Sequence, residues 1–148
     1  MPYTRFETPR NEALHTLVFQ SNEEPTIGIE LELQLVDASQ HQLKSAILDI
    51  IRHVGEDQQW LKPELMQSYV EVNTGVCRNI QEARMDLSSK LDRLYEAAVA
   101  HDTRILWAGS HPFSTWMEQE ITPSARYHKL VELMQDTARR IVTFGMHV

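Results

Sequence analysis

The stretch that most constrains the fold is TIGIELELQLV, residues 26–36, in which apolar and polar side chains alternate. A period of two residues is that of a β-strand, whose successive side chains point to opposite faces of a sheet. We therefore expect aliphatic side chains on one face and Glu30, Glu32 and Gln34 on the other. A strand with one apolar and one polar face is typical of antiparallel or mixed sheets that cover a core on one side.

The remaining elements follow from similar patterns. Period-two alternation predicts strands, and apolar residues three and four apart predict helices. Strands are expected over residues 65–73, 103–108 and 142–148, and helices over 43–53, 80–101 and 122–141. The order predicts one α+β domain over residues 25–148, with helices packed on one face of an antiparallel or mixed sheet. We interpret residues 1–24 as a lead-in segment with one short helix near residues 12–19.

Charge and cysteine content exclude several classes of protein. The chain has 14 Lys and Arg against 21 Asp and Glu, a net charge of -7, which disfavours nucleic acid as a partner. Cys77 is the single cysteine, so a disulfide within the chain and a cysteine-rich zinc site are excluded, and we expect a small buried or turn residue. No apolar run reaches the roughly 20 residues that a membrane span needs, and none resembles a signal peptide. We therefore expect a cytoplasmic protein that does not bind membranes.

Two neighbouring carboxylates on one strand face need an explanation. Glu30 and Glu32 are about 6 to 7 Å apart at the backbone, and at an effective dielectric near 20 they repel by about 2 kcal/mol. A solvated face would screen this repulsion, and it is the commoner explanation of a lone Glu-x-Glu pattern. The alternative is a Mg²⁺ or Mn²⁺ site, because hard divalent cations bind several carboxylate oxygens held on rigid elements.

A second acidic pair bears on this choice. Glu64 and Glu71 are seven residues apart, an odd number, so on an uninterrupted strand they would face opposite sides. If both belong to one site, Pro63 or a bulge must break the alternation. His147 lies in the alternating run VTFGMHV, where a lone histidine is either structural or a ligand.

Nucleotide-binding glycine loops of the Walker or G-x-G-x-x-G type do not occur in the sequence. Any nucleotide would therefore have to be held by metal ions and basic side chains. Arg126 and Tyr127 at the head of a predicted helix are placed to pair with an anion, although a surface arginine is the commoner outcome.

Four stretches together resemble the glutamate-cysteine ligase type 2 family, also called carboxylate-amine ligases, within the glutamine synthetase-like superfamily. They are TIGIELELQLVD, ELMQSYVEVNTGVC, WAGSHPFSTWMEQEITPSARY and FGMHV, and they extend over residues 25–148. The resemblance implies a glutamine synthetase/guanido kinase-like catalytic fold. It also implies ATP-dependent ligation through an acyl phosphate, typified by joining the γ-carboxyl of glutamate to the amino group of cysteine in glutathione biosynthesis.

The same resemblance implies roles for individual residues. The implied metal ligands are Glu30, Glu32, Glu64, Glu71 and His147, by the motifs G-I-E-x-E, acid-x6-Glu and G-x-H. Arg126 and Tyr127 match an Arg-Tyr pair with a substrate-side role, and residues 109–112 match a family loop. Mg²⁺ or Mn²⁺ is thus the expected cofactor, and ATP and amino acids are the expected small-molecule partners.

The chain departs from the family in length. Family members are more than twice as long, and this sequence stops at GMHV, where they continue with H-V-G. We therefore expect an N-terminal portion of the catalytic domain that is inactive as a ligase by itself. The competing hypothesis is a non-catalytic binding module that retains this half of the fold and self-associates into a homo-oligomer.

Overall fold

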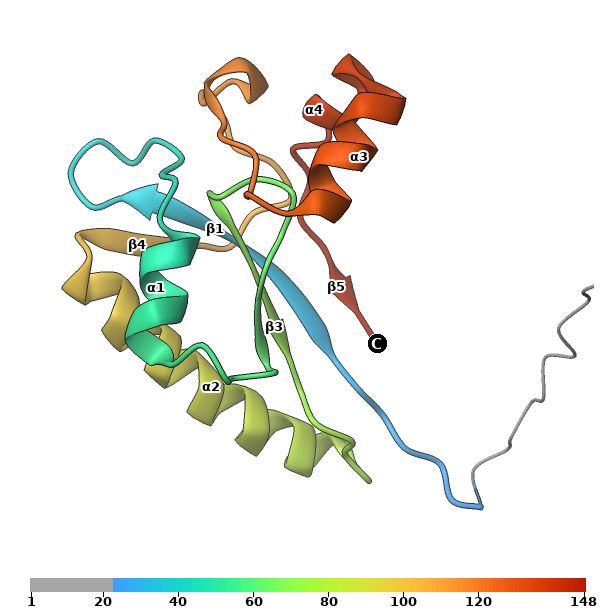
Figure 1. Cartoon of the computed structure of the whole chain (residues 1–148). Coiled ribbons are helices and arrows are strands. Elements are labelled where there is room, and N and C mark those ends of the chain that lie inside the picture. Colours follow the sequence, from blue (N-terminus) through green and yellow to red (C-terminus); the bar gives the residue numbers. More distant parts are fainter. Residues whose placement is uncertain (1–22) are drawn as a thin grey trace, which may run out of the picture.

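Strand β1, Glu30–Asp37, confirms the strand that the alternation predicts, and it lies at the centre of the sheet. The structure is a computed structural model that describes residues 23–148, and within them five strands form one antiparallel sheet (Figure 1). The other strands are β2 Leu61–Pro63, β3 Tyr69–Asn73, β4 Thr103–Leu106 and β5 Met146–His147. The order is β2-β3-β1-β4, and β5 pairs with β1 along the edge that β4 also uses. The predicted antiparallel α+β class is confirmed.

The apolar face of the sheet packs against two helices, α1 Ile47–Val54 and α2 Ile80–Ala100, which lie on the same side of the sheet (Figure 1). The aliphatic side chains of β1 that point to this face are buried, and they are Leu31, Leu33 and Leu35. Fully burying one such side chain stabilises the fold by about 2 kcal/mol. This face holds the main core of the described chain.

Helix α2 begins as the sequence predicts. The side chain of Asn79 accepts a hydrogen bond from the backbone N–H of Glu82 at 2.9 Å, and the Glu82 carboxylate accepts one from the N–H of Arg78 at 2.8 Å. These two bonds satisfy N–H groups that have no partner inside the helix. The cap therefore fixes where the longest helix of the described residues starts.

The strand expected over residues 65–73 is wrong in its first half. The chain instead forms β2, turns through residues 64–68 and returns as β3. Pro63 is tolerated because β2 is an edge strand, and the turn is tied elsewhere by a bridge between Met66 and Ile121. A chain reversal, and not a bulge, breaks the alternation between Glu64, at the start of this turn, and Glu71 in β3.

The helix expected over residues 122–141 is shorter and interrupted. Helix α3 covers Ala125–Met134, and α4, Asp136–Arg139, follows a break at Gln135, whose φ is 51°. A positive φ lies outside the helical region, so the two helices cannot form one. Leu133 of α3 is 73% exposed, although it belongs to the apolar residues whose spacing predicted this helix.

A second, smaller apolar cluster joins α3 and α4 to the sheet. The rings of Tyr69 and Phe144 meet edge to face at 4.3 Å, and Ala138 of α4 is buried with them. Figure 1 shows α3 and α4 across the sheet from α1 and α2, so the predicted packing on one face holds for α1 and α2. The connection before α3 contains the short 3-10 helix η1, Trp116–Glu118.

The remaining predictions have mixed outcomes. Cys77 is buried, as predicted, and its backbone pairs with Ile27. The last strand is two residues long, Met146–His147, and not the predicted 142–148. The helix predicted near residues 12–19 lies outside the described residues. Within residues 23–148, every helix is too short or too polar to cross a lipid bilayer.

Candidate functional site

The polar face of β1 and β3 gathers the predicted acidic residues. In the antiparallel register Glu32 lies directly opposite Glu71, and Glu30 lies opposite Asn73. Directly opposed side chains of an antiparallel pair point to one face with Cβ atoms about 5 Å apart, and like charges placed so are destabilising. The register therefore brings together carboxylates that lie far apart in the sequence.

Glu64 joins this group from the turn between β2 and β3. The hydroxyl of Tyr127 in α3 donates a hydrogen bond to the carbonyl oxygen of Pro63 at 3.0 Å, which holds the start of the turn. Burial, a hydrogen bond with Glu71 and repulsion by Glu71 and Glu32 raise the pKa of Glu64 to about 7. Glu64 therefore retains a proton close to neutral pH and donates it toward Glu71.

Glu71 lies among hydrogen-bond donors. Its Oε1 accepts a hydrogen bond from Lys62 Nζ at 3.0 Å and one from Asn73 Nδ2 at 2.6 Å. Burial acts to raise the pKa of Glu71, but the hydrogen bonds from Asn73, Lys62 and Glu64 outweigh it and lower that pKa. The two pKa values of this coupled pair are thus pushed apart, which favours the protonated form of Glu64 and the charged form of Glu71, and Lys62 pairs with the latter.

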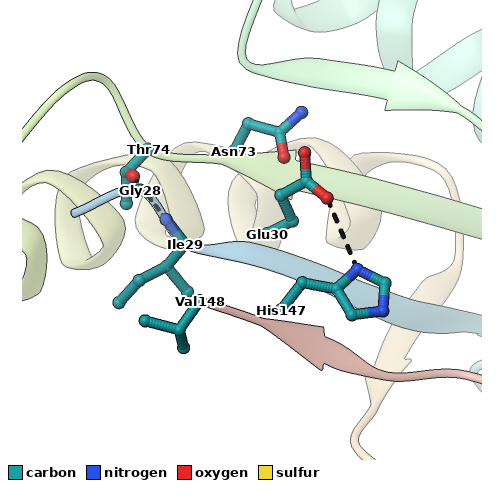
Figure 2. A pocket seen from close by; sticks show the side chains of 7 residues that line it. All are labelled: Gly28, Ile29, Glu30, Asn73, Thr74, His147 and Val148. Atoms are coloured by element: carbon teal, nitrogen blue, oxygen red, sulfur yellow. Dashed lines mark hydrogen bonds and ion pairs between the residues drawn. The ribbon is translucent and has the colours of Figure 1, made fainter. Parts of the chain in front are cut away.

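Strand β5 brings His147 beside Glu30. The two residues are opposed in the register, and His147 Nδ1 lies 3.4 Å from Glu30 Oε2 (Figure 2). Glu32 helps to dock this strand, because its Oε2 accepts a hydrogen bond from the backbone N–H of Gly145 at 2.8 Å. The two carboxylates therefore have different contacts. Glu30 faces His147, and Glu32 holds the strand β5 that carries this histidine.

Two of the hollows that border these side chains are lined by His147. The first has a volume of about 340 Å³, and among its lining residues are Glu30, Asn73, Thr74 and His147 (Figure 2). The second has a volume of about 270 Å³, and among its lining residues are Glu32, Glu64, Tyr69, Phe144 and His147. Four of the five predicted ligands thus border a volume that a small ion or molecule can enter.

A divalent cation needs several donor atoms that converge on one point. In residues 23–148 no three His, Cys, Asp or Glu side chains converge closely enough to hold a metal ion as they stand. They form two pairs instead, Glu30 with His147 and Glu64 with Glu71. Carboxylate oxygens on strands are the donors that Mg²⁺ prefers, and the amide oxygen of Asn73, opposite Glu30, is buried without a partner. The chemistry fits such an ion, and the role of these residues as ligands stays a prediction.

Similarity to known proteins decides which family carries this arrangement. Residues 26–148 match the model of glutamate-cysteine ligase family 2 (GCS2). The chain belongs to this family. The resemblance inferred from the four sequence stretches is therefore confirmed.

Curated relatives share the name "Putative glutamate--cysteine ligase 2". The protein of Chloroflexus aurantiacus is 46% identical over 125 residues, which are 82% of this chain and 32% of the relative. That of Thermobifida fusca is 41% identical over 138 residues, 90% of this chain and 35% of the relative. That of Gloeobacter violaceus is 35% identical over 136 residues, which are 90% of this chain and 37% of the relative. The chain thus spans about a third of the length of these glutamate-cysteine ligase family 2 relatives.

The Arg-Tyr pair of this family member lies at the start of α3. Tyr127 is half-buried, and burial, followed by the charge of Glu64, raises its pKa. Its hydroxyl is engaged with Pro63, so its visible role is to hold the turn that carries Glu64. Arg126 is exposed, with its guanidinium carbon 5.6 Å from the centre of the Tyr127 ring. Their substrate-side role stays a prediction.

The loop at residues 109–112 is braced by its histidine. His111 Nδ1 accepts a hydrogen bond from the N–H of Ser114 at 2.9 Å, and Nε2 lies 2.9 Å from the carbonyl oxygen of His41. This loop therefore has a bracing contact of its own, and its Gly109 lines a hollow together with Glu32.

Three polar residues on the acidic face of this glutamate-cysteine ligase family 2 chain were not predicted as site residues. Asn73 was placed on the correct face by alternation but given no role. Lys62 was missed because β2 was missed, and the signal that could have found it is Pro63, which is typical of a sheet edge. Gln34 is fully buried, with Nε2 donating to the carbonyl oxygen of Ala108 at 2.9 Å and Oε1 without a partner.

Proposed function

We propose that this chain supplies the acidic, cation-binding face of an ATP-dependent carboxylate-amine ligase that joins the γ-carboxyl of glutamate to the amino group of cysteine. Membership of the family and the name of the relatives support this reaction class. The observation that carries the proposal is the opposition of Glu32 and Glu71 with Glu64 beside them, three carboxyl groups on one face. We extend the proposal to a glutamine synthetase-like fold for the domain to which this antiparallel sheet belongs.

The residues that would hold Mg²⁺ or Mn²⁺ are Glu30, Glu32, Glu64, Glu71 and His147. When bound, the ion supplies positive charge that neutralises the oxygens of the ATP phosphates during phosphoryl transfer. In the proposed reaction an oxygen of the glutamate γ-carboxylate attacks the γ-phosphorus of ATP, and ADP leaves. The amine nitrogen of cysteine then attacks the acyl carbon, phosphate leaves, and the nitrogen releases one proton to solvent as the amide forms.

The chain's own contribution is to hold like charges together before any ligand arrives. The cross-strand register fixes the Glu32 and Glu71 backbones, and the docked β5 fixes His147, so little ordering remains to be done on binding. In the absence of an ion the proton on Glu64 and the ammonium of Lys62 reduce the repulsion. The arrangement is a negatively charged face poised to take up positive charge.

The proposal is tested by titrating the 148-residue chain with Mn²⁺ and then with ATP in the presence of Mn²⁺, by calorimetry and by electron paramagnetic resonance of Mn²⁺. We expect saturable Mn²⁺ binding that is lost in the E32Q/E71Q double variant and kept in E56Q, which changes an exposed loop carboxylate. Absence of Mn²⁺ and ATP binding, together with dimerisation in sedimentation, would instead favour the non-catalytic module.

A further inference from the structure

One ion pair on the acidic face joins a basic side chain to a predicted cation ligand. Among the ion pairs of Lys and Arg in residues 23–148, only that of Lys62 with Glu71 involves a predicted ligand. Two of the other three lie within helices α1 and α2, and the third joins Lys44 to Asp37 at the end of β1. Lys62 is thus singled out by its partner.

The pairing of the strands places Lys62 on the same face as Glu71 and Glu32. Lys62 in β2 is opposed to Glu71 in β3, which is itself opposed to Glu32 in β1. The three side chains therefore form a row across the sheet, with the ammonium at its outer end. Lys62 Nζ and Asn73 Nδ2 both bind Oε1 of Glu71, so this oxygen is occupied by donors while no ion is present.

The exposures of the two partners differ in a way that matters for exchange. The Lys62 side chain is 49% exposed and that of Glu71 13%. Glu71 therefore needs a positive partner where it is, whereas Lys62 can swing its flexible stem into water at little cost. A divalent ion carries twice the charge of the ammonium and prefers the same carboxylate oxygen.

We propose that Lys62 is a built-in counter-cation of the acidic face, which holds Glu71 while no divalent cation is bound and gives way when one binds. This inference rests on the proposed function, because it presupposes that Glu71 is a cation ligand. It assigns to Lys62 a role in setting the cation affinity. A chain that carries this lysine binds its ion less tightly than one without it, but keeps Glu71 paired while no ion is bound.

The test is the Mn²⁺ affinity of the 148-residue chain and three variants. K62M removes the competing charge, and we expect about tenfold tighter Mn²⁺ binding, the effect of one unit charge a few ångströms from the ion at a partly exposed site. K62R keeps the charge and should stay within about twofold of the parent, by the same argument. The matched control is R52M, which removes a positive charge from an ion pair with Asp49 on α1, across the sheet, and should leave the affinity unchanged.

Two further measurements separate a competing charge from a merely structural side chain. The affinity ratio of K62M to the parent should shrink as salt is raised, because screening weakens both partners of the competition. Without Mn²⁺, K62M should melt at a temperature about 2 °C lower than the parent, and excess Mn²⁺ should reverse the difference.

The outcomes distinguish this inference from the proposed function. If the parent binds Mn²⁺ and K62M binds it equally or more weakly, Lys62 is not a competitor, while the cation site stands. If neither chain binds Mn²⁺, the cation site is wrong and the role of Lys62 falls with it. Tighter binding by K62M alone among the variants supports the inference.

Discussion

The two faces of the sheet are built from alternate residues of the same strands, yet they are held by different forces. On one face Leu31, Leu33 and Leu35 pack against α1 and α2 without polar partners. On the other, Glu30 and Glu32 meet Asn73 and Glu71 with like charges opposed. Every side chain buried on the first face stabilises the fold, whereas the opposed carboxylates of the second face destabilise it.

A strand can thus contribute to the stabilising core on one side and to the candidate site on the other. Since neighbouring residues alternate between faces, the apolar side fixes the register and the register then fixes which acidic residues meet. The acidic face needs no packing of its own to be positioned. Its unfavourable electrostatics persist because the core on the reverse side compensates for them.

The largest effect should come from the apolar face. Leu35→Ala removes a side chain with no exposed surface, so we expect the free energy of unfolding to fall by about 3 kcal/mol. Chemical denaturation measures this change. Leu133→Ala, at a side chain that is 73% exposed, is the control and should shift stability by less than about 0.5 kcal/mol. An equal fall in the free energy of unfolding of both variants would contradict the conclusion that the apolar face supplies most of the stability.

The acidic face should reveal itself through pH. The pKa of Glu64 is about 7 in the folded chain against an ordinary value of 4.5, so the folded state binds more protons between these values and its stability falls as pH rises through that window. After allowance for solvent screening the effect is about 2 kcal/mol. Urea unfolding between pH 4.5 and 8 measures it in the absence of divalent cations. In E64Q this part of the slope should disappear, and an unchanged slope would show that Glu64 titrates normally.

The smallest effect is the relief of repulsion. Glu32→Gln removes one of two opposed carboxylates, and without divalent cations we expect a gain of about 0.5 kcal/mol, because the lost docking of Gly145 partly offsets the gain. Thermal melting at low salt measures it, with E56Q as the charge-matched control. A loss of more than about 1 kcal/mol would mean that Glu32 serves mainly as a strand anchor.

Much of this architecture could be predicted from local pattern, and the exceptions have physical causes. The alternation of β1 and the apolar spacing of α2 are local properties, and both predictions are confirmed. The split at Pro63 was missed because a three-residue strand has too few residues to show a period. The break at Gln135 was missed because the apolar spacing continues through it, although the backbone does not.

The sequence predicted five ligands, a role that stays a prediction, but it did not predict how these residues pair. Motif resemblance supplied the five residues, and alternation placed Glu30 and Glu32 together. Only tertiary structure shows that Glu64 lies beside Glu71, which raises the pKa of Glu64, and that Lys62 pairs with Glu71. Likewise, alternation put Gln34 on the polar face but could not show that Ala108 covers it, because such a contact depends on how a distant connection folds back.

The short strand β5 makes part of the site kinetically separate from the rest. Glu30 and His147 are 117 residues apart, and closing so long a loop costs conformational entropy that a two-residue strand recovers only in small part. Segments of this kind open independently of the global unfolding transition. Amide hydrogens at residues 145–147 should then exchange faster than those of β3, and an ion that joins His147 to Glu30 would slow them. Exchange of the amide hydrogens of β5 would thus report whether an ion occupies the candidate site.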